Sequence, residues 1–260
     1  MTGDAPAVEN ILEVHDVRRV FGGVVALAGI SLAVPKGKVV GLIGPNGSGK
    51  TTLVNVISGM LRPTSGTVQL KGKTISGLPT HRIAKMGLSR TFQVVRPFTN
   101  MTVLENVAIG AMFGGADGGH SAAAAMQVAR TVLDRVGLGS RADAPAEELT
   151  VMGRKRLELA RALASGPDVL LLDEVLAGLR SSELEEAISL VRSVSESGVT
   201  ILIIEHVLRV IVSLCDQIVV INRGQKIAEG VPDVVMRNQA VIDAYLGHRA
   251  STRHNGPTFA

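Results

Sequence analysis

The hydrophobic positions of this chain change their spacing from region to region, and these changes mark the expected elements. Residues 11–20 and 25–34 are rich in valine and other strand-forming side chains, and Gly22-Gly23 between them predicts a turn. A shorter strand is expected over residues 67–70, between two turns that contain glycine. These segments predict an antiparallel β-sheet in the N-terminal part of the chain.

Short apolar runs predict a second, buried sheet. Residues 39–43, 169–172 and 200–204 are almost entirely aliphatic, as expected for parallel strands that are covered on both faces. Residues 182–195 have the composition of a helix and lie between the last two runs, which predicts a βαβ unit.

The segment 101–164 has a helical character instead. Thr102 and Glu105 form a capping-box pattern, and residues 121–136 are an alanine-rich helix candidate that follows a glycine-rich, flexible loop at 114–119. A further helix is expected over residues 157–164, with a start near Val151. We interpret the whole segment as a helical insertion between two parts that contain strands.

Composition narrows the class of protein. The 260 residues are 46% hydrophobic, which is enough for one large domain or two closely joined subdomains. The net charge is only +4 and aromatic residues make up 2%, which disfavours a platform for single-stranded nucleic acid. Cys215 is the only cysteine, so the chain has no intramolecular disulfide, and we expect a reducing compartment.

Neither secretion nor membrane insertion is indicated. The first residues lack a basic region followed by an apolar one, and the apolar stretch 199–215 is interrupted by Glu205, His206 and Arg209. The mean hydropathy of +0.30 fits either a large aliphatic core or a surface that docks on a membrane protein. Residues 251–260 are polar, and we expect them to be a disordered tail.

The strongest chemical signal follows the first aliphatic run. The sequence there fits G-x-x-x-x-G-K-[ST], a loop whose backbone N–H groups surround phosphate oxygens at a helix N-terminus. Lys50 is expected to reach the β- and γ-phosphates, and Thr51 to bind Mg²⁺. The residues predicted to hold the nucleotide are Gly44, Pro45, Asn46, Gly47, Ser48, Gly49, Lys50, Thr51 and Thr52.

Polar residues at the ends of two other strands complete the expected site. Asp173 and Glu174 follow the run 169–172, at the sheet edge where α/β proteins bind ligands. Asp173 is expected to hold Mg²⁺ and Glu174 to orient or deprotonate the attacking water, the alternative being a solvated acidic pair. His206 follows the next strand and could bind the γ-phosphate, unless it is structural. Gln93 is a neutral candidate ligand for Mg²⁺ or water.

In this order, these motifs resemble the nucleotide-binding subunit of an ABC transporter over roughly residues 9–247. The resemblance makes 44–52 the Walker A motif, Gln93 the Q-loop, 169–174 the Walker B motif with its catalytic glutamate, and His206 the switch histidine. Phe21 stands where the family places an aromatic that stacks on adenine, the alternative being a core residue at a strand end.

The resemblance implies an α/β fold with a P-loop NTPase (RecA-like) core, an N-terminal antiparallel β-subdomain and an inserted α-helical subdomain. One nucleotide-binding domain is expected over residues 1–250, with a catalytic core at 9–93 and 165–247 and a helical subdomain at 94–164.

Several segments resemble the importers of branched-chain and other hydrophobic amino acids in particular. They are Arg90–Gln93, Met101–Val107, Arg156–Leu163, Ile204–His206 and Ala244–Gly247. Amide or urea importers and a lipopolysaccharide-export ATPase share parts of this pattern, so the substrate stays open.

The chain departs from the family pattern in three places. The signature Leu-Ser-Gly-Gly-Gln is here Leu149–Gly153, with Met152 in place of the second glycine. Thr150 and Gly153 are the remaining candidates there for contact with the γ-phosphate held by an opposite subunit. Val175 replaces a proline, and Arg180 replaces an Asp or Asn.

These departures favour an asymmetric pair, in which a second ATP-binding subunit completes this chain's site and the partner's own ATP faces the weaker signature. A homodimer in which 149–153 works as it stands is the alternative. The basic run 154–156 could suggest nucleic-acid binding, but at the start of the signature helix it fits phosphate contact or a solvated face.

The resemblance implies ATP and Mg²⁺ as cofactors and a peripheral position on the cytoplasmic face of the inner membrane. Its implied partners are two transmembrane permeases, contacted through a groove near residues 93–99, and indirectly an external substrate-binding protein, with no nucleic acid. Three other classes stay open: a soluble ABC ATPase outside transport, a P-loop kinase, and a regulator that binds nucleotide without hydrolysis.

Overall fold

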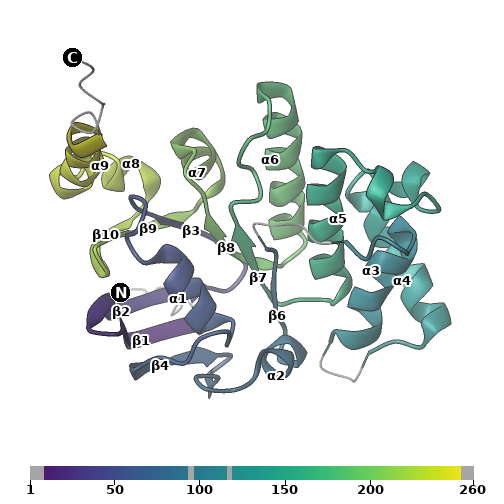
Figure 1. Ribbon diagram of the computed structural model, residues 1–260, viewed down its shortest axis with the longest axis horizontal. Coiled ribbons are helices and arrows are strands. Elements are labelled where there is room, and N and C mark those ends of the chain that lie inside the picture. Colours follow the sequence, from purple (N-terminus) through teal and green to yellow (C-terminus); the bar gives the residue numbers. More distant parts are fainter. Residues whose placement is uncertain (1–8, 93–96, 116–118, 253–260) are drawn as a thin grey trace, which may run out of the picture.

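The computed structural model describes residues 9–92, 97–115 and 119–252. The N-terminal part of the chain forms an antiparallel sheet with the strand order β2-β1-β4-β5 (Figure 1). Its strands are β1 (Asn10–Phe21), β2 (Val24–Pro35), β4 (Ser65–Leu70) and β5 (Lys73–Thr74). The predicted strands and the turn between the first two are confirmed, and both turn glycines have positive φ. The two-residue strand β5 was not expected.

A second sheet has the order β10-β9-β3-β8-β7-β6, and all its neighbours are parallel except β10 and β9. Its strands are β3 (Val39–Ile43), β6 (Leu88–Arg90), β7 (Val169–Asp173), β8 (Thr200–Ile204), β9 (Gln217–Asn222) and β10 (Gln225–Gly230). The three aliphatic runs form the adjacent strands β3, β8 and β7. The pairing of β7 with β8 as parallel neighbours was predicted, whereas the place of β3 beside β8 was not. Sequence reasoning missed β6 and the β9–β10 hairpin.

Each central strand divides its side chains between two cores. Leu170 and Leu172 of β7 join the core on the side of the helical insertion, whereas Val169 and Leu171 join the core under the antiparallel sheet. Successive side chains of a strand point to opposite faces, so a strand covered on both faces needs apolar residues throughout. This requirement explains why the runs are continuous rather than alternating.

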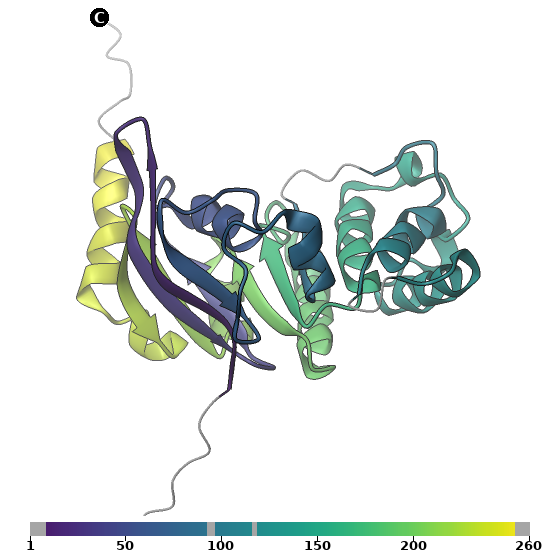
Figure 2. The ribbon, with the colours of Figure 1, turned by 90° about the horizontal axis from the view of Figure 1, so that it is seen from below.

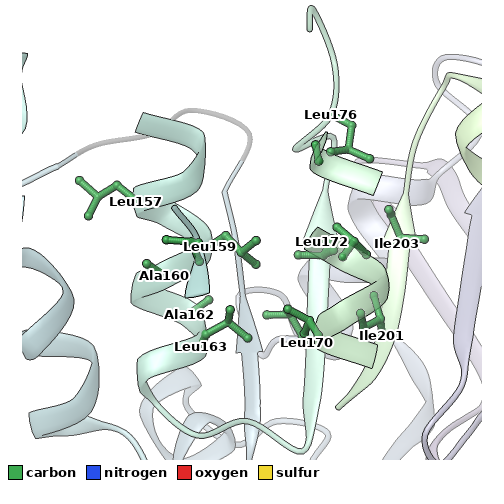
Figure 3. Packing of buried hydrophobic residues seen from close by; sticks show 14 of the residues in the cluster. Leu157, Leu159, Ala160, Ala162, Leu163, Leu170, Leu172, Leu176, Ile201 and Ile203 are labelled. Atoms are coloured by element: carbon green, nitrogen blue, oxygen red, sulfur yellow. The ribbon is translucent and has the colours of Figure 1, made fainter. Parts of the chain in front are cut away.

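The helical insertion forms a separate lobe of α3 (Val103–Phe113), α4 (Ala122–Arg135) and α5 (Val151–Ala164) (Figures 1 and 2). The capping box is confirmed, because the Glu105 N–H donates to Thr102 Oγ1 over 3.1 Å and the Thr102 N–H donates to Glu105 Oε2 over 2.8 Å. Helix α5 joins the lobe to the sheet. In Figure 3 its Leu159 and Leu163 point toward β7, and Leu157 points away from it.

The other α-helices are α1 (Lys50–Ile57), α2 (Thr80–Lys85), α6 (Ser181–Glu196), α7 (Leu208–Leu214), α8 (Pro232–Val235) and α9 (Gln239–Thr252). Helix α6 confirms the predicted βαβ unit. Helix α9 lies at the opposite end of the molecule from the helical lobe and runs two residues into the expected tail, of which 253–260 lie outside the described residues (Figure 2). Within the described ranges, no helix has the length and apolar character needed to cross a membrane.

Candidate phosphate-binding site

The predicted phosphate loop connects β3 to α1, and tight packing requires glycine at both of its ends. A side chain at Gly44 would come within 2.0 Å of the Ile221 carbonyl oxygen, and one at Gly49 within 2.7 Å of the Ala26 carbonyl oxygen. Both residues have positive φ, 153° and 108° respectively. The loop is therefore pressed against the neighbouring strands β9 and β2, and helix α1 begins directly after it.

A hollow of about 590 Å³ opens above this loop. It brings together most of the predicted residues, namely Asn46, Gly47, Ser48, Gly49, Lys50, Thr51, Thr52, Glu174 and His206. Gly44 and Pro45 are not among its lining residues. Five residues that sequence reasoning did not select also line it: Val24, Val25, Ala26, Arg223 and Gly224. The Arg223-Gly224 turn after an aliphatic run was the only local signal that could have pointed to any of them.

Lys50 is the first residue of α1, and its side chain is buried against the phosphate loop. Its Nζ donates to the carbonyl oxygens of Gly44 and Pro45 over 2.8 and 2.9 Å. Burial lowers the pKa of the Lys50 ammonium, and the nearby carboxylates of Glu174 and Asp173 oppose this effect. A phosphate in the hollow would replace the two carbonyl acceptors with charged oxygens, which form stronger hydrogen bonds with an ammonium.

Glu174 and His206 meet across the hollow. Nε2 of His206 is hydrogen-bonded to Oε1 of Glu174, although the two residues are 32 positions apart. Parallel pairing of β7 with β8 brings the two strand ends to one edge, as the sequence predicts. Glu174 has a φ of 53°, a conformation that non-glycine residues rarely adopt, and this turns the chain sharply after β7.

Asp173 is buried beneath the hollow rather than on its wall. Its Oδ2 accepts from Arg90 Nη2 over 2.7 Å, and both side chains are almost fully buried. Arg90 also donates to Asn55 Oδ1 over 2.6 Å, which ties α1 to β6 and β7. Sequence reasoning selected Asp173 as a metal ligand but did not foresee this ion pair, because Arg90 lies 83 residues earlier.

Three other candidates, Thr150, Gly153 and Phe21, are not among the residues that line the hollow. Thr150 and Gly153 are at the start of α5, where the Gly153 N–H donates to Thr150 Oγ1 over 3.1 Å. Phe21 is at the tip of the β1–β2 hairpin, 41% exposed, with the Arg19 guanidinium 4.4 Å from its ring centre. Gln93 lies outside the described residues, so its predicted role stays a prediction.

Comparison with known proteins gives consistent matches. The family model described as "ABC transporter" matches residues 27–177, and that of the "branched-chain amino acid ATP-binding cassette transporter" matches residues 225–251. The chain is 40% identical to the high-affinity branched-chain amino acid transport ATP-binding protein BraF of Pseudomonas aeruginosa, over 91% of this chain and 98% of BraF.

A second curated relative and a solved structure indicate the same family. The chain is 37% identical to LivG of Escherichia coli, which carries the same description, over 92% of this chain and 98% of LivG. The crystal structure of the ADP conformation of MJ1267, an ATP-binding cassette of an ABC transporter, superimposes with a TM-score of 0.82 at 33% identity, over 92% of this chain and 99% of that one.

Proposed function

The chain belongs to the ABC transporter family of ATP-binding proteins, and on this premise we propose that it powers the import of branched-chain or related hydrophobic amino acids across the inner membrane. The observation that carries the ATPase assignment is the single hollow in which Lys50, Glu174 and His206 meet. The substrate class is supported by the match of residues 225–251 to the branched-chain family and by the descriptions of BraF and LivG.

The residues around the loop fit a bound nucleoside triphosphate with Mg²⁺. Backbone N–H groups of residues 46–52 would hold the phosphates with Lys50, and the Thr51 hydroxyl would bind the metal, with Asp173 near it. Mg²⁺ would neutralise charge on the phosphate oxygens. Phe21 would contact the adenine, as the hairpin residues Val24–Ala26 already line the hollow.

Glu174 is the residue we propose to orient and deprotonate the attacking water. Its hydrogen bond to His206 keeps the carboxylate directed into the hollow until phosphate competes for His206. Gln93 would contact the metal or the water. Phosphoryl transfer depends mainly on positioning and charge neutralisation, so these groups suffice for hydrolysis.

We further propose that residues 1–250 act as one nucleotide-binding domain at the cytoplasmic face of the membrane, in contact with two permease subunits. A hollow of about 280 Å³ between the core and the helical lobe supports this docking site. Met60 and Phe92 line it, and both are about half exposed, at 52% and 46%. Exposed apolar groups of this kind are typical of protein interfaces.

A second ATP-binding subunit would complete the site, and we favour a heterodimer over a homodimer because of the departures at 149–153. Thr150 and Gly153 of this chain would then face the partner's nucleotide. An external substrate-binding protein would select the amino acid, and we expect no nucleic-acid partner.

The test combines uptake with purification from native membranes. We expect Glu174→Gln to keep ATP binding and to lose at least about 100-fold in ATP turnover. Uptake of radiolabelled leucine should be lost with it, whereas uptake of urea, the alternative substrate, should be unchanged. Mass spectrometry of the mild-detergent complex should find permeases and a second ATPase. Normal leucine uptake in the variant, or purification without any membrane protein, would refute the proposal.

A further inference from the structure

The loop that follows Glu174, residues 175–179, is attached at two points to elements that are distant in sequence. On one side, the Leu176 N–H donates to Glu205 Oε1 over 2.7 Å in the protein interior. On the other, Lys155 Nζ donates to the Ala177 carbonyl oxygen. A carboxylate and an ammonium thus hold the backbone of two consecutive residues, and charged partners make such hydrogen bonds roughly twice as strong as neutral ones.

Glu205 is a charged residue in the protein interior, where such residues are uncommon. It directly follows the buried strand β8 and is 1% exposed, and its Oε2 has no hydrogen-bond partner among the described residues. A buried carboxylate is unfavourable unless its interactions compensate for lost hydration. Burial accordingly raises the pKa of Glu205 to about 7, and the hydrogen bond from Leu176 acts in the opposite direction. An apolar residue would serve packing better, so the carboxylate indicates a role in holding the loop.

Lys155 is placed to connect this loop to α5. It lies in the second turn of α5, after Thr150 and Gly153 at the helix start, and it is half-buried. Burial lowers the pKa of its ammonium, which Glu205 and Glu183 raise in turn. Lys155 loses part of its hydration when it binds the loop carbonyl, which is unfavourable unless the hydrogen bond compensates for it. We therefore interpret it as a residue that links α5 to the loop and not as a solvated surface charge.

Apolar contacts reinforce the same connection. Met152 of α5 lines a small hollow of about 30 Å³ together with Val175 and Leu179 of the loop. Met152 and Val175 are two of the three departures from the family pattern, and here they pack against one core cluster. The departures are therefore spatially related: the methionine that replaces a glycine fills space beside the valine that replaces a proline.

We propose that Lys155 and Glu205 are positioning residues that hold loop 175–179 from both sides, so that this loop, α5 and the end of β8 move as one body. This inference rests on the proposed ATPase function. Glu174 directly precedes the loop and His206 directly follows Glu205, so the two residues that meet in the hollow are both anchored to this body. A change at the phosphates would then reach the start of α5 directly, without passing through α3 or α4 of the helical lobe.

The experiment measures amide hydrogen exchange of the full chain, which does not depend on hydrolysis. Lys155→Met keeps the aliphatic stem and removes the donor, and Glu205→Ala removes the acceptor. Each should raise exchange of the 176–178 amides about tenfold or more, with strand β3 unchanged. Glu205→Gln, which keeps an acceptor for the Leu176 N–H, should retain protection. Lys71→Met, which removes a surface ion pair with Asp168, is the matched control and should change nothing in the loop.

Steady-state kinetics supply the second readout. Lys155→Met and Glu205→Ala should lower kcat for ATP about tenfold or more with KM changed less than about threefold, as expected when a group acts on positioning rather than on binding. Exchange of 176–178 within twofold of wild type in both variants would overturn the proposal even if the chain hydrolyses ATP. Increased exchange in a chain without hydrolysis would instead leave the loop attachment established and refute the proposed ATPase function.

Discussion

The buried carboxylate of Glu205 makes stability depend on pH in a direction opposite to that of most acidic residues. Its pKa rises from an ordinary value of 4.5 to about 7, mainly because burial removes water from the carboxylate and also because the Glu174 carboxylate is near. The N–H groups of Leu176 and His206 and the ammonium of Lys155 act in the opposite direction and lower the pKa. The folded state therefore binds more protons than the unfolded state between these two values, and the free energy of unfolding falls as pH rises through that window.

The size of the effect follows from the shift. Each pKa unit corresponds to about 1.4 kcal/mol, so the full shift is worth about 3 kcal/mol, of which about 2 kcal/mol falls between roughly pH 5.5 and 8.5. We expect Glu205→Gln to remove this component. The amide keeps the acceptor for the Leu176 N–H and does not titrate, so any packing cost it brings is the same at every pH.

The assay is urea unfolding of both proteins at several pH values, followed by circular dichroism. The free energy of unfolding of wild type minus that of the variant should fall by about 2 kcal/mol between roughly pH 5.5 and 8.5. The subtraction cancels the contribution of groups that titrate in the same way in both proteins. A difference that stays constant across this range would refute the reasoning, because it would mean that Glu205 ionises with an ordinary pKa.

Two further predictions concern packing. Gly44→Ala should unfold more easily and lose ATP binding, measured by calorimetry, because its Cβ would meet the Ile221 carbonyl oxygen at 2.0 Å. Gly72→Ala is the control, since Gly72 also has a positive φ, 70°, but has open space around it, and this variant should retain binding. Leu157→Ala, at a fully buried site of α5, should lower the free energy of unfolding by about 2–5 kcal/mol; a loss below about 1 kcal/mol in urea unfolding would contradict the packing of the lobe.

Sequence reasoning succeeded where the signal is local. The Thr102–Glu105 capping box and the start of α5 at Val151 were predicted correctly, since a helix cap is made by residues three or four positions apart. The phosphate loop was equally predictable, because strand, glycines and helix are contiguous. Strand β6 was missed because three residues carry too little pattern to distinguish a strand from a loop.

The candidate site was predictable only in part. Glu174 and His206 could be paired in advance, since neighbouring parallel strands end at one edge. Arg90 beneath Asp173 could not be predicted, because no local pattern indicates that β6 pairs with β7. The Arg223-Gly224 turn is recognisable as a turn, but its place on the wall of the hollow depends on the pairing of β9 with β3, which no local pattern indicates. Gln93 and the residues assigned to contact a partner's nucleotide stay predictions.

The phosphate loop, three of the buried strands and the helical lobe follow from the amino-acid sequence alone, because backbone hydrogen bonds, caps and hydrophobic spacing act over about ten residues or fewer. The surroundings of each charged side chain, in contrast, depend on how the elements pack together. Glu205 is interior, and it holds Leu176 because sheet order brings the end of β8 beside the turn after β7. Such contacts join residues 22 to 83 positions apart, and their geometry follows from how whole elements pack.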